Sequence, residues 1–81
     1  MRMDAKRDKN EFMERFGSNL AAERKYKGLS QQELADAVGL SLWTISGYET
    51  GQYSPDMASA TAIADVLDVS LDALAGREPP G

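Results

Sequence analysis

The sequence predicts an all-α domain of five helices, and three observations support this fold class. No stretch alternates apolar and polar residues for long enough to indicate a strand. Glycines stand where helices should end, and a glycine adopts the left-handed conformation that closes a helix without steric cost. Serines, which are favoured helix caps, stand where the helices should begin. The residues concerned are Gly28, Gly39, Gly51 and Gly76 at the ends and Ser30, Ser41, Ser54 and Ser70 at the starts.

The first helix is predicted over residues 11–26, because apolar side chains recur there every four residues on one face. These side chains are Phe12, Phe16 and Leu20. The mostly charged segment before this helix, residues 1–10, is expected to be a flexible extension. Residues 77–81 contain two prolines that cannot continue a helix, so they are expected to form a disordered tail. The domain itself is therefore expected over residues 11–76.

The second and third helices are predicted over residues 31–38 and 42–49. Ser30 is followed three residues later by Glu33, which matches the capping box that opens a helix. Ser41 is the expected cap of the third helix. The residues expected to face the core are Leu34, Ala35 and Val38 in the second helix and Ile45 and Tyr48 in the third.

The fourth helix is predicted over residues 56–67, with Ser54 as its cap and Pro55 in its first turn. The fifth is a short helix over residues 71–75. The inward residues of the fourth helix are expected to be Met57, Ala60, Ile63, Ala64 and Leu67. Two interpretations stay open for the apolar residues near the end of the chain: they form a dimer patch, or they close the core over the first helix. These residues are Val66, Leu71 and Leu74.

The composition argues against several classes of protein. The 81 residues include no cysteine and no histidine, which excludes disulfides and thiolate metal sites and removes the commonest general base. No glycine-rich phosphate loop or metal-ligand spacing is present, so we expect neither an enzyme nor a cofactor. Asp65, Asp68 and Asp72 are interpreted as acids at helix ends rather than as a cation site. No apolar run is long enough to span a membrane, and no signal peptide is apparent, so a cytoplasmic protein is expected.

The net charge of −4 is unevenly distributed along the chain. Residues 1–27 carry eight basic and five acidic residues, a net charge of +3. Residues 28–81 carry one basic and eight acidic residues, a net charge of −7. Such an asymmetry either marks a surface for an anionic partner or reflects ordinary solvated helix faces.

The second and third helices are joined by Gly39-Leu40-Ser41, and a short glycine-containing turn between two helices is typical of a helix-turn-helix. The stretch LSQQELADAVGLSLWTISGYETG resembles this unit in the phage-repressor and Cro-like regulators, often called Xre-like. ERKYKGLSQ upstream and SPDMASATAIADVLDVSLDAL downstream extend the resemblance over roughly residues 16–74. The resemblance implies a five-helix lambda-repressor-like DNA-binding domain in which helices 2 and 3 form the helix-turn-helix.

The resemblance also assigns roles to particular residues. Gln31 matches a glutamine that binds a backbone phosphate, although a plain surface glutamine is the alternative. Arg24 and Glu49 match a buried ion pair between the first and third helices, with an Arg24 free to hold phosphate as the alternative. The loop from Gly51 to Ser54 matches a segment on the DNA backbone, but it is uncharged here and is equally an ordinary polar loop.

The third helix would turn four residues toward the bases: Leu42, Trp43, Ser46 and Gly47. Relatives usually carry Gln, Arg, Lys or Asn among these positions, and none is present here, so direct hydrogen-bond readout should be weak. Trp43 has three interpretations: contact with thymine methyl groups or the sugar-phosphate wall, a protein contact, or partial burial beside the first or fourth helix. Gly47 either admits a close approach or is a tolerated surface defect.

The function expected from the resemblance is a small sequence-specific transcription regulator that binds double-stranded DNA as a homodimer and represses by occupying a promoter. The residues expected to contact phosphate are Gln31, Thr44, Gln52, Tyr53 and Ser54, with Lys25 and Lys27 adding positive charge. The alternative is a protein-interaction module on the same fold, which would bind a partner regulator or a toxin through the Trp43 surface.

Overall fold

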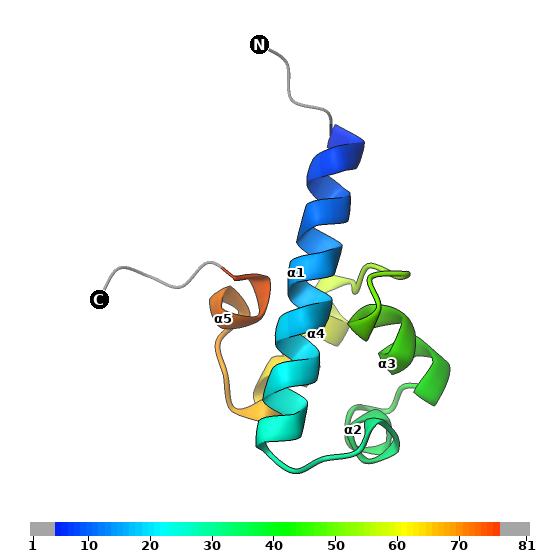
Figure 1. Ribbon diagram of the computed structural model, residues 1–81. Helices are drawn as coiled ribbons and strands as arrows, with labels where there is room; N and C mark the ends of the chain where they lie inside the picture. The colour runs from blue at the N-terminus through cyan, green and yellow to red at the C-terminus, as the bar shows by residue number, and fades with distance from the viewer. Residues whose placement is uncertain (1–4, 77–81) are drawn as a thin grey trace, which may run out of the picture.

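The computed structural model describes residues 5–76, with side chains described from Asn10 onward. The described residues form five helices and no strand, which confirms the all-α prediction. In chain order the helices are α1 (Ala5–Tyr26), α2 (Gln31–Val38), α3 (Leu42–Glu49), α4 (Met57–Leu67) and α5 (Leu71–Ala75). α1 runs the full height of the molecule, and the other four helices gather around its C-terminal part (Figure 1).

The bounds of α2, α3 and α5 are those predicted, whereas α1 begins earlier than expected. It starts at Ala5 rather than at residue 11, so residues 5–10 of the predicted extension are helical and the predicted start of the first helix is wrong. Four of these six residues, one alanine, two lysines and one arginine, are strong helix formers, and the segment contains no glycine or proline to stop the helix. Residues 1–4 and the predicted tail, 77–81, lie outside the described residues.

The start of α4 also differs from the prediction, since its cap is Asp56 rather than Ser54. The Asp56 Oδ1 atom accepts a hydrogen bond of 2.7 Å from the Ser59 backbone N–H. Met57 is then the first residue of the helix and is 73% exposed, so the prediction that it lies in the core is wrong. It borders an open groove together with Phe12 and Leu71. Met57 is at the first position of α4, whereas the buried residues of this helix begin at Ala60.

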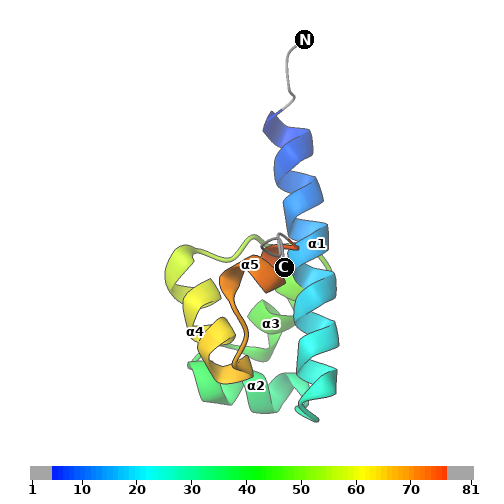
Figure 2. The ribbon, with the colours of Figure 1, turned by 90° about the vertical axis from the view of Figure 1, so that its left-hand side faces the viewer.

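The buried core is shared by all five helices. α1 packs against α3 and α5, and α2 packs against α3 and α4 (Figures 1 and 2). The buried apolar side chains are Phe16, Leu20, Leu34, Ala35, Ile45, Tyr48, Ala60, Ile63, Ala64, Leu67 and Leu74. Leu74 is fully buried and its carbonyl accepts a 3.0 Å hydrogen bond from the Asn19 amide, so α5 closes the core over α1. Within the described residues, no helix is long and apolar enough to cross a membrane.

Candidate nucleic-acid interface

The turn between α2 and α3 is closed by a glycine in a conformation that other residues rarely adopt. Gly39 has φ 73°, and the Leu40 N–H donates to the Ala35 carbonyl at 3.0 Å. Ser41 then caps α3, because its hydroxyl accepts a 3.1 Å hydrogen bond from the Thr44 N–H. Ala35 and Ile45 are both fully buried at the junction of the two helices. The turn therefore sets the angle at which α3 leaves α2.

A buried ion pair holds α3 against α1. The Arg24 Nε and Nη2 atoms donate to the two Glu49 carboxylate oxygens at 2.6 and 3.0 Å, and Arg24 Nη1 donates to the Leu29 carbonyl at 2.7 Å. The two side chains are only 10% and 7% exposed. The hydrogen bond to Glu49 raises the pKa of Arg24 above its usual value, against the opposing effect of burial. Three of its five N–H groups are bonded within the protein and the side chain is buried, which favours a structural role for Arg24 over a phosphate contact.

Gln31 belongs to the same network. Its side-chain Nε2 donates to Glu49 Oε1 at 3.0 Å, which links the start of α2 to the end of α3. The side chain is half-buried rather than a plain surface glutamine. An amide nitrogen carries two N–H groups, so Gln31 keeps one for another acceptor. The network therefore holds in a fixed position the residue expected to bind phosphate.

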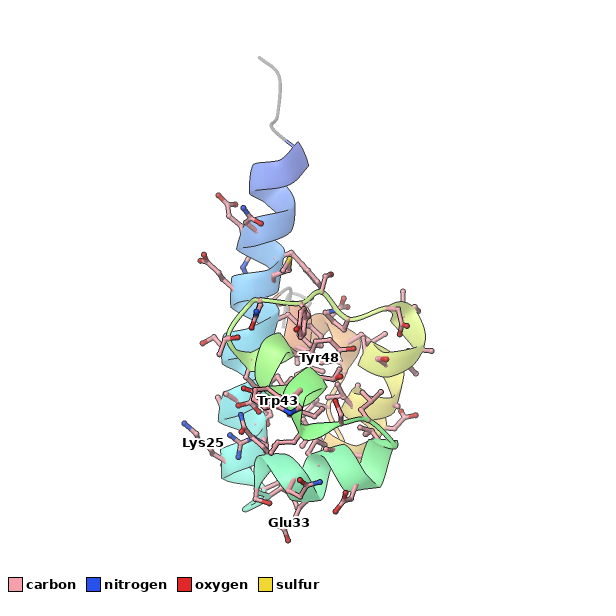
Figure 3. The ribbon with its side chains drawn as sticks, turned by 90° about the vertical axis from the view of Figure 1, so that its right-hand side faces the viewer. Lys25, Glu33, Trp43 and Tyr48 are labelled. Atoms are coloured by element: carbon pink, nitrogen blue, oxygen red, sulfur yellow. The ribbon has the colours of Figure 1, made fainter. Side chains whose placement is uncertain are left out.

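The outward surface of α3 is apolar and uncharged. Trp43 is 81% exposed and Leu42 is 40% exposed, while Ser46 is half-buried. Figure 3 shows Trp43 on the outward surface of α3, with Lys25 at one edge and Glu33 on α2. The interpretation of Trp43 as partly buried beside a neighbouring helix is therefore wrong. The Thr44 hydroxyl lies 2.8 Å from that of Ser41, so it is already part of the helix cap.

Gly47 is not exposed on this surface, contrary to the prediction from the sequence. It is buried, and a Cβ atom placed on it would overlap the ring carbons Cδ2 and Cε2 of Tyr53. The prediction that Gly47 itself faces the bases is corrected: the Tyr53 ring occupies the place of its missing side chain. The only sequence signal for this arrangement was a mid-helix glycine followed by an aromatic residue beyond the next glycine, Gly51.

The loop that carries Tyr53 is fixed to α3 through the carbonyl of Gly47. That oxygen accepts from the backbone N–H groups of Gln52 and Tyr53, at 2.8 and 3.1 Å, and from the Thr50 hydroxyl at 3.3 Å. Gly51, with φ 79°, makes the reversal possible. Gln52 and Ser54 are exposed beside the half-exposed Tyr53. The loop is therefore a continuation of the α3 surface.

Positive charge lies only at the margin of this surface. Lys25 and Lys27, at and just beyond the end of α1, are both exposed. Across the described residues of α2 to α5 there is no basic residue, and Glu33 and Asp36 are exposed on α2. The residues that the structure describes contain no group of three acids able to hold a metal ion.

Comparison with known proteins supports the assignment of α2 and α3 as a helix-turn-helix. A family model described as Helix-turn-helix, HTH_3, matches residues 20–74. The chain is 41% identical over 58 residues to the cryptic phage CTXphi transcriptional repressor RstR of Vibrio cholerae, covering 72% of this chain and 52% of RstR. It is 31% identical over 62 residues to the immunity repressor of Bacillus phage phi105, covering 76% of this chain and 43% of that protein.

A solved structure shares the fold. The restriction-modification controller protein C.AhdI from Aeromonas hydrophila superimposes with a TM-score of 0.73 at 34% identity, over 76% of this chain and 94% of that protein. The chain spans about half the length of the curated relatives it matches first, 52%, 51% and 55%. The matched region contains the turn, the ion pair and all of α2 to α4. This chain belongs to the HTH_3 helix-turn-helix family.

Proposed function

We propose that this chain is a small sequence-specific DNA-binding transcription regulator that acts as a repressor rather than as an enzyme. The observation that carries the proposal is an outward helix, α3, held rigidly by a buried ion pair beside a helix-turn-helix junction. A helix mounted in this way is what a major-groove reader requires. The names of RstR and the phi105 protein, both repressors, support regulation by repression.

The proposed contacts divide into two kinds. Leu42, Trp43 and Ser46 are the residues proposed to face the bases. Leu42 and Trp43 are exposed on α3, and Ser46 is half-buried. Donors around them meet the DNA backbone and position the helix without reading sequence. The residues proposed to contact phosphate are Gln31, Thr44, Gln52, Tyr53, Ser54, Lys25 and Lys27. No cofactor takes part in this mechanism.

The proposed assembly is a cytoplasmic homodimer on double-stranded DNA. Two copies of α3 would enter successive major grooves about one helical turn apart, which requires a palindromic site. The test is a selection from randomised duplex DNA with the purified chain. Enrichment of a palindrome is the expected result, and the absence of any enriched sequence would refute the proposed function.

The dependence of affinity on salt tests the contact map separately. Each neutralised phosphate adds a slope of about −0.9 to the logarithm of the affinity against the logarithm of salt concentration. Arg24 is already paired with Glu49, and among the described residues the proposed contact map assigns only two cations to phosphate, Lys25 and Lys27. We therefore expect a slope much shallower than the value of about −9 that ten contacts would give. A slope near −9 would contradict this contact map.

A second function, docking of a protein partner on α3, is favoured by one observation, the 81% exposure of Trp43. The Trp43→Ala variant separates the two functions. Under the DNA-binding proposal it weakens binding to the selected duplex. If its DNA affinity is unchanged while a complex with another protein dissociates, the docking function is correct at this site. Tyr26→Ala, which removes an 83% exposed ring from α1, is the matched control.

A further inference from the structure

The outward surface of α3 includes a residue that does not belong to the helix. Positions 43 and 47 lie four residues apart and hence on one side of α3. At the first stands the exposed Trp43, and over the second lies the ring of Tyr53. The surface is therefore lined by two aromatic side chains, one from the helix and one from the loop after it.

The position of Tyr53 is built by several independent features. Three donors from residues 50–53 converge on the Gly47 carbonyl, and Gly51 supplies the positive φ that the turn requires. A side chain at position 47 would displace the ring, which gives a reason for glycine in the middle of a helix, where glycine is otherwise unfavourable relative to alanine. The ring stays 48% exposed, so it is available for contact.

The chemistry of this surface selects among the groups that DNA presents. Of the described side chains turned outward on α3, none is charged and none is an amide. The carboxylate of Glu49, the one acid of the helix, accepts hydrogen bonds from Arg24 and Gln31. In the major groove each base pair presents hydrogen-bonding edges, and the 5-methyl group of thymine is the apolar feature. The surface has only the indole N–H and hydroxyl groups for hydrogen bonding, and no charged or amide side chain that could bind a base edge through two hydrogen bonds. Its two aromatic rings therefore match the thymine methyl group best.

We infer that the indole of Trp43 and the ring of Tyr53 together determine the specificity of this chain, and that they recognise thymine 5-methyl groups in the major groove. The phosphate contact proposed above for Tyr53 belongs to its hydroxyl and not to its ring. The inference rests on the proposed DNA-binding function. It adds the chemical group that is recognised, the thymine methyl, and the contribution of a loop residue, Tyr53, to that recognition. It gives α3 a means of discriminating between bases although its outward positions carry no charged or amide side chain.

The test uses the duplex enriched by selection from randomised DNA, with each thymine replaced in turn by deoxyuridine. This change removes one methyl group and keeps every hydrogen-bonding group. Affinity should fall about fourfold at each methyl that is contacted, the value expected for one buried apolar carbon. The dependence should disappear at one position in Trp43→Ala and at another in Tyr53→Ala.

Two further variants distinguish the ring of Tyr53 from its hydroxyl and from general damage. Tyr53→Phe keeps the ring and should keep the methyl dependence. Gly47→Ala displaces the ring and should lose it at the same position as Tyr53→Ala. Tyr26→Ala, an equally exposed ring on α1, should keep it at every position. Thermal melting confirms that each variant is folded.

The possible failures are distinguishable. If the wild type binds its selected duplex tightly and no deoxyuridine substitution weakens it, methyl recognition is refuted while the proposed function stands. If methyl dependence persists in both Trp43→Ala and Tyr53→Ala, the assignment to these rings is wrong. If no duplex is enriched at all, the proposed function and the inference fall together.

Discussion

The two sides of α3 differ in burial, because the inward side is packed in the core and the outward side is exposed. Its inward side carries Ile45, fully buried, and Tyr48, 6% exposed, and it ends in Glu49, which is paired with Arg24. Its outward side carries Trp43, 81% exposed, and a glycine covered by Tyr53. Both sides are formed by the same eight residues and share one backbone.

The difference shows which interactions determine the structure of each side. The inward side is determined by packing and by a buried charge pair, both of which tolerate few alternatives. The outward side consists of the exposed Trp43 and of Gly47, which the ring of Tyr53 covers from the following loop. Stability should therefore respond to changes on the inward side, and recognition to changes on the outward side.

The largest expected effect is on the inward side, in Arg24→Met. This variant leaves the Glu49 carboxylate buried without its cationic partner, which should cost about 4 kcal/mol in the free energy of unfolding. Urea denaturation of the variant and the wild type measures the difference. Lys25→Met, which removes an exposed charge from the next residue, should change stability by less than about 0.5 kcal/mol.

The double variant Arg24→Met/Glu49→Met shows whether the stranded charge is the cause. Replacing both partners removes the unpaired carboxylate, so it should recover most of the stability lost in the single variant. If the double variant is as unstable as Arg24→Met alone, the loss comes from packing around residue 24 and the charge argument is wrong.

The next prediction compares the two sides of α3 directly. Ile45→Ala opens a cavity at a fully buried site and should destabilise the fold by about 3 kcal/mol. Trp43→Ala removes a larger side chain, yet it should change stability by less than about 0.5 kcal/mol because that side chain is exposed. DNA affinity measured under folding conditions should fall in Trp43→Ala. Equal losses of stability would show that Trp43 is buried in solution.

The inward side could be predicted from the sequence because its signals are local. Serine caps, closing glycines and helical spacing of Leu34, Ala35 and Ile45 place α2, α3 and their core residues with the correct bounds. The pairing of Arg24 with Glu49, by contrast, came from the resemblance to a family. Composition and spacing alone do not bring together two charges that are 25 residues apart.

The outward side could be predicted only in part, because its form depends on tertiary contacts. The sequence shows that Trp43 lacks a charged neighbour on α3, but not that Tyr53 folds back over Gly47. The same limitation explains the errors at α4. Ser54-Pro55 and Asp56 are both acceptable starts by local rules, and the path of the loop decides between them.

Substitution of alanine for two glycines, Gly17 and Gly47, should give a smaller difference in the free energy of unfolding between the two sides. At Gly17, on α1, a Cβ atom would overlap the backbone oxygens of Tyr48 and Glu49, so Gly17→Ala must push α1 away from α3. This overpacking should cost about 2 kcal/mol, within the range for inserted core atoms. At Gly47 the overlap is with a half-exposed ring that can rotate away, and alanine favours the helix by about 1 kcal/mol.

Gly47→Ala should therefore change the free energy of unfolding by less than about 1 kcal/mol, while it alters recognition. Urea denaturation of both variants checks the contrast. If Gly47→Ala destabilises the fold as much as Gly17→Ala, the Tyr53 ring is held rigidly, and the outward side is packed in the same manner as the inward side.

The smallest effect concerns the far end of the loop that carries Tyr53, where Asp56 caps α4. Hydrogen bonding to the Ser59 N–H lowers the pKa of Asp56 below its usual value of 3.8. Because the folded-state pKa lies below the unfolded one, the carboxylate stabilises the fold fully above pH 3.8 and loses this effect as the pH falls through the folded-state value.

Asp56→Asn keeps an acceptor for the cap but does not titrate, so its stability relative to the wild type should rise as the pH is lowered from about 6 to about 3. Denaturation midpoints measured across this range test the sign, and a constant difference between the two proteins would show that Asp56 does not hold the start of α4 through its charge.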